Sequence, residues 1–147
     1  MEKVLIILRG WPGSGKSTYA KQKARELNAV ICSIDDYFIN RHGEYVYKPN
    51  EVPFAHAYCI RQFLNAVSLN KNIIVDNINM HARQYSIYYN IGLAYHYQIK
   101  IKTLNGHYES IHDIPEAIIE KMKKNWPKLP FEYLKASTQY VTLKDLI

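Results

Sequence analysis

The chain has 147 residues, enough for one domain, since domains typically run to about 100–150 residues. With 48% hydrophobic and 22% charged residues, its composition is that of a folded protein and excludes wholesale disorder and fibrous repeats. No apolar run approaches the roughly 20 residues of a membrane-spanning helix, and residues 4–8 are too short for a signal-peptide core. We therefore expect a cytoplasmic protein that does not enter a membrane.

The charge balance is basic, with 19 Lys and Arg against 13 Asp and Glu, a net charge of +6. This balance favours polyanionic partners such as nucleic acid or phosphorylated substrates, although charge that serves only solubility explains it equally well. Cys32 and Cys59 have no metal-binding spacing and are expected to be buried free thiols. The six histidines show no zinc-ligand spacing either.

Predicted strands and helices alternate along the chain, which indicates an α/β fold around a parallel sheet. Residues 3–9 form a continuous apolar run, typical of a strand buried on both faces. Further strands are expected at 29–34, 72–76 and 96–102, and helices at 17–28, from Pro53 onward, at 81–93 and at 114–126. In the helix from Pro53, the spacing predicts a core face made of Ala57, Ile60, Leu64 and Val67. Residues 128–147 have little pattern.

Residues 10–17, GWPGSGKS, match G-x-x-x-x-G-K-[ST] at every fixed position, between a predicted strand and a predicted helix. The glycines let successive backbone N–H groups point at phosphate oxygens, and the start of the helix adds its positive end. Lys16 should reach the β- and γ-phosphates, and Ser17 should ligate Mg²⁺. A glycine-rich turn without nucleotide is the alternative. The predicted nucleotide-binding residues are Gly10, Pro12, Gly13, Ser14, Gly15, Lys16, Ser17 and Thr18.

Three carboxylates follow predicted strands, at the sheet edge where ligands bind in open α/β folds. Asp35 is predicted to orient an acceptor hydroxyl and take its proton, and Asp76 to lie on the Mg²⁺ side. The alternative for Asp35 and Asp36 is N-capping of a helix at 37–40, and for Asp76 a turn before Asn77.

Five segments in this order resemble the P-loop kinases related to bacteriophage polynucleotide 5′-kinase, most closely the branch with the kinase domain of the NEDD4-binding protein 2 family. The segments, spread over residues 3–126, are GWPGSGKST at 10–18, SIDDYF at 33–38, EYVYKPN at 44–50 followed by Ala55 and His56, IIVDNIN at 73–79 and HDIPEAIIEKM at 112–122.

The resemblance implies a three-layer α/β P-loop kinase fold with a small, mostly parallel sheet in the order 2-3-1-4. A single domain is expected over residues 1–147, with a core of about 3–126 and a tail of 127–147. The implied activity is ATP- and Mg²⁺-dependent phosphorylation of a hydroxyl, in the parent enzyme the 5′-OH of DNA or RNA. By position, Lys16 and Ser17 bind nucleotide and metal, Asp35 is the general base, and the strand-end acid of the phage enzyme aligns with either Asp76 or Asn77.

Two departures from the family pattern concern arginines. Phe38 stands where the phage enzyme has an arginine, and residues 103–114, where family members carry an arginine-bearing lid, contain none. Such an arginine contributes several orders of magnitude in rate. Either Arg41, Arg83 or a histidine substitutes for it, or a partner supplies it, or catalysis is weak or lost.

Asp36, Arg41, Asn79 and Arg83 lie in the segments that follow the predicted strands, and we expect them to contact the substrate. For the two arginines, the alternative is a solvated position on the surface. Trp11 is expected at the surface of the site, where it contacts nucleotide or covers the helix. For four tyrosines, ordinary packing is favoured over base stacking; these are Tyr45, Tyr47, Tyr88 and Tyr89. For three lysines, a solvated helix face is favoured over nucleic-acid contact; these are Lys121, Lys123 and Lys124.

Two rival functions stay open. One keeps the kinase and changes the acceptor to a nucleoside, a nucleotide or another small molecule. The other is a catalytically weak nucleotide-binding protein that acts through a partner, which the missing lid arginine supports.

Overall fold

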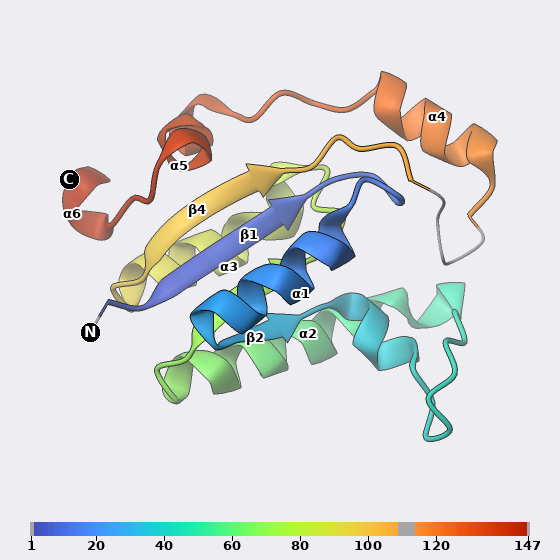
Figure 1. The fold of residues 1–147 in the computed structure, drawn as a ribbon, viewed down its shortest axis with the longest axis horizontal. Helices are drawn as coiled ribbons and strands as arrows, with labels where there is room; N and C mark the ends of the chain where they lie inside the picture. Colours follow the sequence, from blue (N-terminus) through green and yellow to red (C-terminus); the bar gives the residue numbers. More distant parts are fainter. Residues whose placement is uncertain (1, 109–113, 147) are drawn as a thin grey trace.

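The computed structural model describes residues 2–108 and 114–146 and has a four-stranded, fully parallel sheet at its centre (Figure 1). The strand order is β2-β3-β1-β4, so the predicted fold class and strand order are confirmed. The strands are β1 (Val4–Arg9), β2 (Ala29–Cys32), β3 (Asn72–Asp76) and β4 (Gln98–Thr103). Because all four run in the same direction, their carboxyl ends share one edge of the sheet.

Helices cover both faces of the sheet. In Figure 1, α1 lies in front, α2 and α3 lie behind, and α4 lies beyond the carboxyl ends of the strands. The helices are α1 (Lys16–Leu27), α2 (Val52–Ser68), α3 (Ala82–Ala94), α4 (Glu116–Lys124), α5 (Leu134–Thr138) and α6 (Leu143–Leu146), with short 3₁₀ turns η1 (Ile34–Phe38), η2 (Pro49–Glu51) and η3 (Phe131–Tyr133). Among the described residues, no helix combines the length and apolar character that crossing a bilayer requires.

The apolar run of β1 is buried on both sides, as its sequence predicts. Ile6 and Leu8 pack toward α1, in a small cluster with Ala20. Leu5 and Ile7 point the other way, into the larger core beneath α2 and α3. Alternate residues of one strand therefore hold the two helical layers together.

The predicted core face of α2 is wrong at two positions. Ala57 is exposed and Leu64 is 42% exposed, whereas Ala55, Cys59 and Phe63 are fully buried. The predicted and the observed core residues both repeat at helical spacing, but they are centred on different faces of the helix. The helix begins directly after the 3₁₀ turn η2, and η1 packs against it, so these contacts set its rotation about its axis.

The tail, which has little pattern in the sequence, returns to the open edge of the sheet. The Ile99 N–H donates to the Val141 carbonyl at 2.8 Å, and the Val141 N–H donates to the Ile99 carbonyl at 2.9 Å. This antiparallel bridge covers backbone groups of β4 that would otherwise be unpaired.

A buried arginine joins the elements that surround the carboxyl end of β1. Arg9 is 2% exposed and donates from Nε to the Asn79 carbonyl and from Nη2 to the Met80 carbonyl, both at 2.9 Å. Its Nη2 also donates to the Pro127 carbonyl at 3.3 Å, and its guanidinium lies 5.3 Å from the ring centroid of Trp126. Burial lowers the pKa of Arg9. The cation is therefore held by carbonyl dipoles and aromatic faces.

Replacing Arg9 by lysine should destabilise the fold, because one ammonium group cannot serve three carbonyls from the position of a planar guanidinium. We expect the free energy of unfolding in urea to fall by about 1–3 kcal/mol for Arg9→Lys, the usual cost of unsatisfied buried polar groups. Arg25→Lys, at an exposed position of α1, is the matched control and should change little. Equal stability of the two variants would contradict the role given to Arg9.

Candidate functional site

The predicted phosphate loop lies between β1 and α1, and its glycines are needed where they stand. Gly13 and Gly15 have φ angles of 81° and 100°, in the left-handed region that favours glycine. A Cβ atom on Gly10 would lie 2.3 Å from Ser14 Oγ and 2.9 Å from the Leu104 carbonyl oxygen, so no side chain fits there. The backbone is thus wrapped tightly around the start of α1.

The segment after β4, residues 104–108, runs beside this loop, and we call it the strap. The Gly106 N–H donates to the Ser14 carbonyl at 3.1 Å, and the Tyr108 N–H donates to the Gly13 carbonyl at 2.7 Å. Within the described part of the chain, the N–H groups of Gly13, Gly15 and Lys16 have no backbone acceptor. The strap therefore satisfies two carbonyls of the loop, while three neighbouring N–H groups are left without a backbone acceptor among the described residues.

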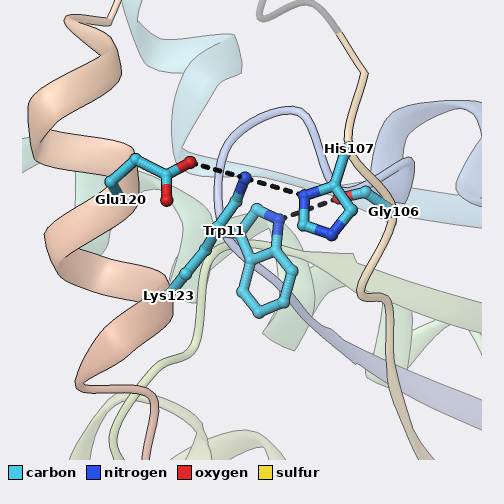
Figure 2. A network of polar contacts seen from close by, with 5 residues as sticks. All are labelled: Trp11, Gly106, His107, Glu120 and Lys123. Carbon is cyan, nitrogen blue, oxygen red and sulfur yellow. Dashed lines mark hydrogen bonds and ion pairs between the residues drawn. The ribbon is translucent and has the colours of Figure 1, made fainter.

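Side chains tie the strap and α4 to the loop (Figure 2). Trp11 donates from Nε1 to the Gly106 carbonyl at 2.9 Å. Lys123, from α4, lies 2.8 Å from His107 Nδ1 and pairs with Glu120 at 3.2 Å. Because an ammonium group can only donate, His107 accepts at Nδ1 in this contact. Helix α4 is thereby connected to the strap on one side of the loop.

Two expectations about this region are wrong. Trp11 is 9% exposed, and its ring packs edge-on against Trp126 at 5.6 Å, so it is not a surface residue of the site. The Lys123 side chain is 17% exposed and contacts His107, so it does not belong to a solvated helix face. A cavity of about 250 Å³ adjoins this network, lined by Trp11, Pro12, Gly13, His107, Tyr108, Glu116, Ile119 and Lys123.

Lys16 lies in the electrostatic field of two of the predicted carboxylates. Burial lowers the pKa of Lys16, and the negative charges of Asp76 and Asp35 oppose that shift. Its Nζ donates to the Trp11 carbonyl at 3.3 Å. The Lys16 ammonium of α1 thus interacts electrostatically with carboxylates that follow β2 and β3.

Asp35 and Asp36 lie in the first turn of η1, directly after β2, but neither caps it. The cap is Ser33, whose Oγ accepts the Asp35 N–H at 3.1 Å, so the N-capping alternative is wrong. The Asp35 carboxylate accepts a hydrogen bond from the Tyr45 hydroxyl at 3.1 Å. Asp36 is exposed overall, yet desolvation of its carboxyl raises its pKa, and the charge of Asp35 raises it further.

The structure distinguishes the two candidates at the end of β3. Asp76 is half-buried and pairs in register with Leu8, two residues before the loop. Asn77 is 6% exposed, and its Oδ1 accepts the Ile34 N–H at 2.9 Å, so its side chain holds the ends of β2 and β3 together. Of these two candidates, Asp76 is the one whose charge acts on Lys16.

The remaining predicted substrate contacts differ in exposure. Asn79 is 2% exposed, and its Nδ2 donates to the Leu8 carbonyl at 2.8 Å, so its amide is used inside the fold. Arg41 is exposed in the turn after η1, and Arg83 is exposed in the first turn of α3. The expected lid segment is described only at residues 103–108 and 114, and the rest of it lies outside the described residues.

The predicted metal ligands fit a nucleotide-dependent ion. In the ranges that the structure describes, no three His, Cys, Asp or Glu side chains converge on a point where an ion could sit. The two predicted ligands are a hydroxyl and a carboxylate. Ser17 is exposed in the first turn of α1, and Asp76 is half-buried. Mg²⁺ is commonly bound by one or two carboxylates completed by substrate phosphates and water. A buried Ser14 Oγ without a hydrogen-bond partner among the described residues also marks the loop as a polar cradle.

Sequence reasoning missed Tyr45, the strap and His107 as parts of this site. Tyr45 is ten residues from Asp35, and neither spacing nor periodicity indicates that the two side chains meet. The strap acts through backbone groups, which carry no residue signature. The E-Y pair at residues 44–45, in a segment that resembles the kinase family, is the one available signal.

Comparison with known proteins gives the same grouping. The AAA_33 family model, described as an AAA domain, matches residues 5–113. Human NEDD4-binding protein 2 is 29% identical over 137 aligned residues, which cover 85% of this chain and 8% of that protein. The uncharacterized protein PM0531 of Pasteurella multocida (strain Pm70) is 23% identical over 133 residues, covering 82% of this chain and 74% of that protein.

Solved structures share the fold at low sequence identity. A chain of the Pnkp1/Rnl/Hen1 complex superposes with a TM-score of 0.61 at 22% identity, covering 96% of this chain and 45% of that chain. The Mycobacterium tuberculosis APS kinase CysC, in complex with AMPPNP and APS, superposes with a TM-score of 0.53 at 13% identity, covering 95% of this chain and 83% of that chain. Both likenesses support the P-loop kinase fold.

Lys16→Met should separate stability from nucleotide binding. Because burial lowers the pKa of Lys16, its proton is held less firmly in the folded chain than in the unfolded one, and carrying the charge costs stability at neutral pH. We expect the melting temperature without nucleotide to stay the same or rise in Lys16→Met. In the wild type, magnesium ATP at 100 times its Kd should stabilise the fold by about 2.7 kcal/mol and so raise the melting temperature. We expect this rise to be lost in Lys16→Met.

Lys21→Met, an exposed change in the same helix, should keep the full response to magnesium ATP. A Lys16→Met variant that responds to magnesium ATP as the wild type does would remove Lys16 from the nucleotide site.

Proposed function

Because the chain belongs to the AAA_33 family of AAA domains and has the P-loop kinase fold, we propose that it is an ATP- and Mg²⁺-dependent kinase that phosphorylates the 5′-hydroxyl of DNA or RNA. The observation that carries the proposal is that the negative charges of Asp76 and Asp35 both act on Lys16 of the glycine loop.

Each charged group has a separate task in this proposal. Amides of the loop and Lys16 bind the phosphates of ATP, and Ser17 and Asp76 hold the ion, which would neutralise charge on the β- and γ-phosphates when bound. Asp35 accepts the proton of the acceptor hydroxyl as its oxygen attacks the γ-phosphorus. The bond from the γ-phosphorus to the bridging oxygen breaks, and ADP leaves with that oxygen.

A polynucleotide acceptor is supported by the similar structures and the charge. The Pnkp1/Rnl/Hen1 chains that share this fold belong to an RNA repair complex. The net charge of +6 favours a polyanionic substrate. Arg41 and Arg83, both exposed, are the residues we propose for contact with substrate phosphate, and Asp36 adjoins the base.

A small-molecule acceptor is the second candidate, and one observation favours it. The APS kinase likeness covers most of both chains, whereas the Pnkp1 likeness covers less than half of the Pnkp1 chain. A compact kinase with a small acceptor would need no surface beyond the cleft. The chain spans 8% of NEDD4-binding protein 2, so that protein's activity as a whole is not carried over.

Phosphate transfer from γ-labelled ATP tests the proposal. The acceptors are 5′-hydroxyl DNA and RNA oligonucleotides, a panel of nucleosides and nucleotides, and adenosine 5′-phosphosulfate. We expect label on the oligonucleotides, and a turnover reduced by roughly 10²–10⁴ in Asp35→Asn with ATP affinity near that of the wild type, since a positioned base contributes about this much.

Label on a small molecule alone would contradict the polynucleotide acceptor and favour the second candidate, a kinase with a small-molecule acceptor. Unchanged turnover in Asp35→Asn would remove Asp35 as the base. The matched control is Glu132→Gln, an exposed carboxylate in η3 that has no part in the proposed site.

A further inference from the structure

We propose that Tyr45 is a positioning residue for the reaction: its hydroxyl fixes the Asp35 carboxylate in the orientation from which it receives the acceptor hydroxyl. The inference rests on the proposed role of Asp35 as the base. It adds a second residue, from a separate segment of the chain, on which the efficiency of that base depends.

The contact is a hydrogen bond between two half-buried side chains. The Tyr45 hydroxyl donates to Asp35 Oδ1 at 3.1 Å. Burial raises the pKa of Tyr45, and the negative charge of Asp35 raises it further, so the phenol keeps its proton at neutral pH and acts as the donor. A carboxylate has about four lone-pair positions, which lets it hold Tyr45 and receive a substrate hydroxyl together.

Tyr45 is itself held in place by a hairpin-like return of the chain. Residues Ile39 and Tyr45 form an antiparallel bridge, and the Val46 N–H donates to the Phe38 carbonyl at 2.8 Å. Phe38, which is 4% exposed, packs edge-on against the Tyr45 ring with the centroids 6.2 Å apart. The phenol is therefore presented to Asp35 from a fixed backbone and a fixed ring.

The backbone of Asp35 is fixed from the other side. Ser33 Oγ accepts the Asp35 N–H at 3.1 Å and holds the start of η1. That hydrogen bond does not fix the side-chain torsions of Asp35. The Tyr45 hydroxyl restrains them through its contact with the carboxylate. A neutral donor restrains the carboxylate without adding a permanent positive charge beside the base.

Tyr45→Phe removes the hydroxyl and keeps the ring that packs on Phe38. We expect kcat for phosphate transfer to fall by roughly 10–100-fold, the usual cost of losing a residue that orients a catalytic group. The KM for ATP should stay within about twofold, because the loop and Lys16 are untouched. The matched control is Tyr47→Phe in the same hairpin, 53% exposed and 5.1 Å from the Phe38 ring, which should leave kcat unchanged.

A double-mutant cycle separates positioning from a general effect on the fold. In an Asp35→Asn background, Tyr45→Phe should lower kcat by less than about twofold further, because the group that it orients has been removed.

Three results overturn the inference: wild-type kcat in Tyr45→Phe, an equal loss in both backgrounds, or an equal loss in Tyr47→Phe. Absence of transfer by the wild-type chain to every acceptor would overturn the proposed function and this inference with it, whereas an active wild type with an equally active Tyr45→Phe overturns this inference alone.

Discussion

A loop that binds phosphate through its backbone must turn its amides inward, and its carbonyls must then be satisfied elsewhere. In this chain the strap, residues 104–108, does so by donating to the Gly13 and Ser14 carbonyls. Trp11 and the Lys123–His107 contact tie the strap to the loop and to α4. The order of β1 next to β4 makes this possible, because the segment leaving β4 emerges beside the loop that leaves β1.

Much of the fold could be predicted from the sequence, because local patterns and long-range order agree. The strand at 72–76 has the predicted bounds, and the apolar run of β1 indicates the burial on both faces that the structure shows. The rotation of α2 could not be predicted, because Ala55, Cys59 and Phe63 repeat with the same period as the predicted set. Likewise, the pairing of Val141 with β4 depends on backbone groups, which are the same in every residue.

The same distinction applies to the candidate site, where some residues could be predicted from sequence patterns and others could not. The predictions for Lys16, Asp35 and Asp76 follow from a motif and from the rule that strand ends share an edge. In the structure, the charges of both aspartates act on Lys16. Tyr45 and His107 act through single contacts between separate segments, which only the fold creates. The expectation for Lys123 is wrong because helical spacing alone does not show that this lysine, unlike Lys124, turns toward the strap.

The most direct test of the phosphate loop is an NMR titration of the ¹⁵N-labelled chain with magnesium ATP. The amide signals of Gly13, Gly15 and Lys16 should shift and saturate as the nucleotide is added, because their N–H groups exchange water for phosphate oxygens. The amide of Gly92, buried in α3 on the far side of the sheet, should stay in place. Loop amides that remain unchanged at millimolar magnesium ATP would contradict the account.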